Sequence, residues 1–146
     1  MPTSKFERIP NWSKKGPVIE VVFEMFDKQN TSLGTQTKKL LFDSGNDNGI
    51  MLSVGHIEEF KIDGKNLFPV NVSSPGAPSV VQRACLVSIN EINVGKDNIL
   101  EKPMEKKIPL IFSFNPKQTP IIGQTSFMDY TCCINYKDEK FSIEKQ

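Results

Sequence analysis

The stretch Leu40-Leu41-Phe42-Asp43-Ser44-Gly45 decides how this sequence is interpreted. Three consecutive apolar residues predict the end of a buried strand, and an acidic residue follows them directly. A carboxylate at the point where a strand leaves the core stands on a rigid base yet faces solvent. Gly45 allows a tight turn beside it, and Ser44 can form hydrogen bonds within that turn. Asp43 is therefore a candidate functional carboxylate, although an Asp-Ser-Gly triplet by itself more often marks a strand-ending turn without chemistry.

The residues before this stretch predict a partner strand. Apolar side chains occupy every second position from residue 19 to residue 25, which is typical of a half-buried strand. The polar segment 27–36 then predicts a turn, and residues 38–42 predict the second strand of a hairpin that leads into Asp43. Residues 1–17 are largely polar and basic and contain internal prolines, so we expect an extended arm there.

The rest of the chain predicts a mainly β fold with one or two short helices. Residues 50–53 favour a strand, and residues 54–61 favour a helical turn whose Ile57 and Phe60 face inward while His56 faces solvent. Residues 67–72 and 79–89 favour a long hairpin with a Pro-Gly tip. A further strand is expected to end at residues 92–95, and the polar segment 96–107 is expected to be exposed. Residues 108–114 favour a strand with Phe112 and Phe114 in the core. The apolar segment 121–123 precedes a helical turn over 124–130, and a final pair of strands is expected at 132–136 and 141–143.

Composition excludes several classes of function. A length of 146 residues suits one domain with a core of its own. The 18 basic and 17 acidic residues leave a net charge of +1, which is too small to hold nucleic acid or an acidic membrane by charge alone. The single histidine cannot supply the several imidazoles of common zinc sites. We find neither a signal peptide nor an apolar run of about 20 residues, the length of a membrane span, and therefore expect a soluble chain.

Three cysteines are too few and too badly spaced for a disulfide framework. Two of them, Cys132 and Cys133, are adjacent, and the third, Cys85, lies in an apolar alternating run. We expect free, buried thiols, with Cys85 packed in the core rather than acting as a nucleophile.

A second motif lies about eighty residues after the first. Ile121-Ile122-Gly123 is followed by a short helix through Phe127. With Leu41-Phe42-Asp43-Ser44-Gly45, it makes the sequence resemble the retroviral-type (retropepsin-like) aspartic proteases, which pair an apolar strand ending in Asp-Thr/Ser-Gly with a later apolar-apolar-Gly. Order and spacing agree over roughly residues 17–144. The resemblance implies a retropepsin-like acid protease barrel that forms dimers, with residues 1–16 as an N-terminal extension and residues 17–146 as a single protease domain.

The resemblance also implies an activity, that of an aspartic-type peptidase acting on a peptide or protein substrate. Asp43 is then the catalytic residue, supported by Ser44 and Gly45, and Asp43 of a second copy completes the site in a homodimer. The segment Pro75, Gly76 and Ala77 falls where the family has its substrate-binding flap. No metal or cofactor takes part, and neither nucleic acid nor a membrane is an expected partner.

Other interpretations of these residues remain. Residues 43–49 do not fit a calcium-binding EF-hand loop. That loop requires an oxygen ligand at its third position, where this chain has Gly45, and a glycine at its sixth position, where this chain has Asn48. A Ser/His/Asp hydrolase could use only His56, with Ser53 nearby. A non-catalytic peptide-binding or assembly module with the same fold is the main alternative, because Asn46 stands where the family usually has alanine.

Overall fold

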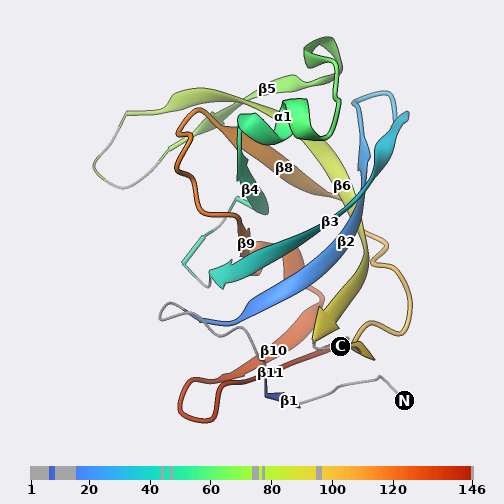
Figure 1. The fold of residues 1–146 in the computed structure, drawn as a ribbon, viewed down its shortest axis with the longest axis vertical. Helices are drawn as coiled ribbons and strands as arrows, with labels where there is room; N and C mark the ends of the chain where they lie inside the picture. The colour runs from blue at the N-terminus through green and yellow to red at the C-terminus, as the bar shows by residue number, and fades with distance from the viewer. Residues whose placement is uncertain are drawn as a thin grey trace.

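The computed structural model describes residues 7–8, 16–43, 45–46, 48–73, 76, 78–94 and 97–145. Within these residues the chain forms two sheets and very little helix (Figure 1). One sheet has the strand order β1-β11-β10, and the other has the order β2-β3-β9-β4-β8-β6-β5, with β7 attached to β6. The strands are β1 (Glu7–Arg8), β2 (Val18–Phe26), β3 (Ser32–Asp43), β4 (Ile50–Ser53), β5 (Phe68–Val72), β6 (Val80–Val94), β7 (Asp97–Asn98), β8 (Ile108–Ser113), β9 (Ile121–Gly123), β10 (Tyr130–Asn135) and β11 (Lys140–Lys145).

The larger sheet closes on itself because β2 pairs with both β3 and β6. Closure removes two open sheet edges and encloses a core between the strands. The helix α1 (Gly55–Glu59) lies at one end of this barrel, and the three-stranded sheet lies at the other (Figure 1). The short 3-10 helices are η1 (Gly64–Asn66) and η2 (Gln124–Phe127). The mainly β prediction with short helices is confirmed.

The β2–β3 hairpin has a shorter turn than the sequence predicted. The structure places the turn between Phe26 and Ser32, so the predicted turn over 27–36 is wrong at its C-terminal end. Asp27 closes the turn early because its Oδ1 accepts hydrogen bonds from the N–H groups of Gln29 and Thr31, both at 2.9 Å. The first residues of β3 are polar because this part of the ribbon faces solvent.

A single long strand, β6, replaces two that were expected. Residues 92–94 continue the strand that begins at Val80 instead of forming another. The register against β2 shifts between Val22, which faces Glu91, and Phe23, which faces Ile89, so Asn90 is the extra residue of a bulge. Residues three apart in a regular strand point to opposite faces. The bulge shifts this alternation by one residue, so Ile89 and Ile92 are both buried.

The segment 97–107 is mostly exposed, as the sequence predicted for 96–107, but three of its apolar residues are buried, in contrast to the prediction. Ile99, Leu100 and Met104 are all buried in the main core. Backbone hydrogen bonds attach the segment to β6, since Ile99 N–H donates to Ile92 O and Met104 N–H donates to Ile89 O, both at 2.8 Å. Three apolar residues spaced irregularly among charged ones produce no period-two pattern, which is why the sequence analysis missed them.

Phe114 is exposed by 56%, so its prediction as a core residue is also wrong. Strand β8 ends at Ser113, and the alternation therefore stops one residue before Phe114. Phe112, in contrast, is fully buried as expected. Within the described residues, no helix has the length and apolar character needed to cross a membrane.

We predict that Ile99→Ala lowers the free energy of unfolding by about 2–5 kcal/mol, because it leaves a cavity in the core. Lys102→Ala, in the same segment, should change it by less than about 0.5 kcal/mol, since Lys102 is exposed and its ion pair with Glu105 is a surface pair. Urea unfolding measures both variants. Equal effects would show that the segment does not pack against the barrel.

Candidate active site

Asp43 lies at the end of β3, beside the second sequence motif. Strands β3 and β9 pair in parallel, with Phe42 opposite Ile122 and Asp43 opposite Gly123. Strand β9 also pairs antiparallel with β4, so it lies between the strands on either side of the Asp43 loop. The two motifs, eighty residues apart in the sequence, are therefore neighbours in the sheet (Figure 1).

The strand that carries Asp43 is anchored on both sides. Phe42 N–H donates to Pro17 O at 2.8 Å, and Leu41 N–H donates to Pro120 O at 3.0 Å. The Phe42 ring packs between the rings of Phe127 and Phe141, each with its centroid 5.5 Å away. These contacts fix the base from which the Asp43 carboxylate projects.

The backbone turns sharply after Asp43 and returns toward its carboxylate. Gly45 N–H donates to Asp43 Oδ1 at 3.0 Å, and Asn46 N–H donates to Asp43 O at 3.2 Å. Asp43 is partly exposed. Of the two residues predicted to support the carboxylate, Gly45 is thus in contact with it, whereas Ser44 lies outside the described residues.

Asn46 points into its own loop. It is only 8% exposed, and its Oδ1 accepts a hydrogen bond from Asn48 N–H at 3.0 Å. Its Nδ2 donates to Gly49 O at 3.5 Å, and Gly123 N–H donates to the same carbonyl at 2.7 Å. The side chain that differs from the usual alanine therefore bonds within its own loop, and the Gly49 carbonyl that it contacts links this loop to β9. The sequence offered no signal for this role, because it depends on which way the amide turns.

A small buried apolar cluster lies on the face of the sheet that carries Asp43. Leu41 points to the same side as Asp43, because residues two apart in a strand share a face. It belongs to a small buried cluster, separate from the main core, onto which Val70 and Val72 of β5 pack. The other buried members of this cluster are Met51, Ala84, Ile111 and Ile121.

The hairpin of β5 and β6 ends near Gly76, which is exposed and has a φ of +77°. A side chain there would meet no atom within 4 Å, so the backbone at the tip stands in open space. Pro75 and Ala77, the other two predicted flap residues, lie outside the described residues.

The alternative nucleophiles lack the surroundings that they need. His56 is half-buried, and its Nδ1 lies 3.2 Å from Ser53 Oγ, within hydrogen-bond distance. The prediction that His56 is solvated is therefore wrong. Among the described residues no carboxylate bonds to the other ring nitrogen, as a triad requires. Burial raises the pKa of the Cys85 thiol to about 12, which keeps it protonated at neutral pH and confirms its place in the core.

The other two cysteines differ from each other because they alternate along β10. Cys132 is half-buried, and burial raises its pKa to about 12. Cys133 faces outward and is exposed, so its prediction as a buried thiol is wrong. All three thiols are free. Within the described residues no cluster of three or more histidine, cysteine or acidic side chains could hold a metal ion.

Comparison with solved structures identifies the fold. The chain superposes on the crystal structure of a retropepsin-like aspartic protease from Rickettsia conorii with a TM-score of 0.53 and 13% sequence identity, over 99% of this chain and 96% of that one. No protein-family model and no curated protein sequence matches the chain. The chain therefore has the retropepsin-like fold, as its two motifs predicted.

We predict that Gly123→Ala lowers the free energy of unfolding by about 1–3 kcal/mol, because it overpacks a rigid contact. A Cβ at residue 123 would lie 2.3 Å from the backbone oxygen of Asn46. Gly55→Ala is the matched control: its new Cβ would meet Ser53 Oγ at an ordinary 3.6 Å, and alanine favours helix over glycine. Chemical denaturation of both variants tests the contact, and a Gly123→Ala protein as stable as the control would contradict it.

Proposed function

We propose that this chain is an aspartic endopeptidase, active as a homodimer in which Asp43 of each copy contributes one carboxylate. The observation that carries the proposal is the position of Asp43. It ends a rigid strand beside Gly123, accepts a hydrogen bond from Gly45 and remains partly exposed, in a chain with the retropepsin-like fold. The sequence holds one Asp-Ser-Gly motif, so a pair of such carboxylates requires two chains.

The chemistry follows from two carboxylates held face to face. At about 3 Å apart they cannot both be ionised, so the pair retains one proton. The ionised carboxylate acts as general base on a water molecule between them, and that water attacks the carbonyl carbon of the scissile peptide bond. The protonated carboxyl stabilises the oxyanion of the tetrahedral intermediate, and a proton then passes to the leaving amine.

The surroundings of Asp43 suggest how the substrate is held. An extended peptide would lie between Asp43 and the β5–β6 hairpin, where Pro75, Gly76 and Ala77 close over it as a flap. Leu41, two residues before Asp43, belongs to the small apolar cluster onto which the valines of β5 pack. We expect the enzyme to prefer apolar side chains next to the scissile bond, since a charged side chain would lose its hydration there.

We predict that Asp43→Asn abolishes peptide hydrolysis and leaves the fold and the dimer intact, because the amide cannot act as a base yet keeps the shape of the side chain. Cleavage of a diverse peptide library, followed by mass spectrometry, measures the loss. Glu58→Gln, a substitution of an exposed helical residue, is the control and should retain full activity. Residual cleavage by purified Asp43→Asn would contradict the role of Asp43.

We also predict faster hydrolysis in mildly acidic than in neutral buffer, because the pair needs one proton.

The wild-type protein should sediment as a dimer under the assay conditions. A strictly monomeric protein at high concentration would contradict the paired carboxylates. A dimer that binds peptides yet cleaves none between about pH 4 and pH 7, the range expected for such a pair, would support the non-catalytic peptide-binding module instead.

A further inference from the structure

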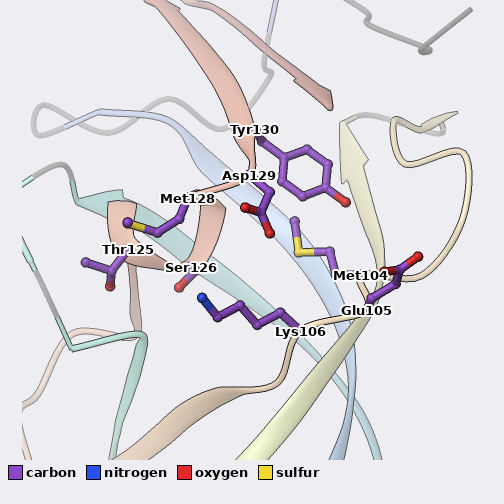
Figure 2. Close-up of a pocket in the computed structure, with 8 residues that line it drawn as sticks. All are labelled: Met104, Glu105, Lys106, Thr125, Ser126, Met128, Asp129 and Tyr130. Atoms are coloured by element: carbon purple, nitrogen blue, oxygen red, sulfur yellow. The ribbon is translucent and has the colours of Figure 1, made fainter. Parts of the chain in front are cut away.

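A pocket that Asp43 does not line lies between the segment that precedes β8 and the residues from η2 to the start of β10. Its volume is about 200 Å³. Met104, Glu105 and Lys106 form one wall, and Thr125, Ser126, Met128, Asp129 and Tyr130 form the other (Figure 2). Pockets for drug-sized ligands measure roughly 300–1,000 Å³. The size therefore limits an occupant to a small molecule.

Both walls of this pocket are held by the core, so the pocket is preformed. Met104 N–H donates to Ile89 O, and Met104 O accepts a hydrogen bond from Ser88 Oγ at 3.3 Å. On the other wall, Phe127 is buried against Phe42. A preformed pocket binds a small ligand without first ordering the chain around it.

Ser126 is a buried hydroxyl without a partner. The residue is only 7% exposed, and its Oγ is the one buried side-chain polar atom among the described residues that has no hydrogen bond. An unsatisfied buried hydroxyl costs stability, which makes it a group that a ligand can satisfy. Figure 2 shows Lys106, an exposed and flexible side chain, extending toward this hydroxyl.

Two opposite charges without ion-pair partners line the same pocket. Glu105 pairs with Lys102 at 3.6 Å, but Lys106 and Asp129 form no ion pair within the described part of the chain. Asp129 enters from the wall opposite Lys106 (Figure 2). Burial, together with the charges of Asp129 and Glu105, raises the pKa of Tyr130, so its hydroxyl stays neutral beside them. The pocket thus carries the Lys106 ammonium on one wall, next to Glu105, and the Ser126 hydroxyl and the Asp129 carboxylate on the other.

We propose that this pocket binds a small zwitterion of amino-acid size, with its carboxylate on Lys106 and Ser126 and its ammonium on Asp129. A carboxylate accepts hydrogen bonds from both a lysine ammonium and a hydroxyl, and an ammonium donates to a carboxylate. Met104 and Met128 supply adaptable apolar surface for the side chain of the ligand. An apolar amino acid fits all three features.

Three related compounds test the proposal on the full chain. L-leucine carries both charges, 4-methylpentanoate lacks the ammonium, and 3-methylbutylamine lacks the carboxylate. We expect leucine to bind with a dissociation constant in roughly the millimolar range, typical of so small a ligand, and each analogue to bind about tenfold more weakly. NMR titration should shift the amide signals of residues 104–106 and 125–130 and leave those of α1 unchanged.

Matched variants separate binding from folding. Lys106→Gln, Asp129→Asn and Ser126→Ala should each weaken leucine binding about tenfold. Lys61→Gln and Glu58→Gln, substitutions of exposed residues outside the pocket, should not weaken it. Ser126→Ala should keep or raise the melting temperature of the ligand-free protein, because it removes an unsatisfied buried hydroxyl. Equal binding of all three compounds, or no leucine binding by the folded wild-type protein, would overturn the proposal; the second result would mean that the pocket holds only water.

Discussion

The close approach of two backbones, at Gly123 and at Asn46, is the constraint on which the rest of the site depends. Parallel pairing of β3 with β9 places Asp43 opposite Gly123, and the loop after Asp43 then passes so near to β9 that no side chain fits at residue 123. The amide of Asn46 and the carbonyl of Gly49 hold that loop in place. Backbone contacts thus hold the loop that follows Asp43, and the N–H of Gly45 in this loop donates to the Asp43 carboxylate.

The closed barrel makes this arrangement rigid. Strand β2 pairs with both β3 and β6, so β3 cannot shift without disturbing the sheet on its other side. The main core lies inside, and the small apolar cluster around Leu41 lies on the face of Asp43. The residues that hold the barrel together and the residues around Asp43 therefore lie on different faces of the same strands.

Sequence patterns predicted the fold correctly where the spacing of apolar residues along a strand matches its buried face. Alternation along β2 and the apolar run before Asp43 gave correct strands, and the two glycine-containing motifs predicted the retropepsin-like fold through their resemblance to that family. Predictions failed where burial depends on tertiary contacts: the irregular apolar residues Ile99, Leu100 and Met104, the bulge at Asn90, and the exposed Phe114 and Cys133. The loop role of Asn46 and the pocket around Ser126 lie beyond any sequence pattern, because each depends on the direction of a single side chain.

The proposed chemistry makes this chain half of an enzyme, although its fold is complete in one copy. A domain of this size can bury its own core, yet one carboxylate cannot both hold and accept the proton that hydrolysis of a peptide bond requires. The central claim is thus that the Asp43 carboxylates of two copies of the chain lie close together. A crystal structure of the assembled protein measures it directly. The account predicts two Asp43 carboxylates about 3 Å apart across a two-fold axis, whereas Asp43 side chains too far apart to share one water molecule would contradict it.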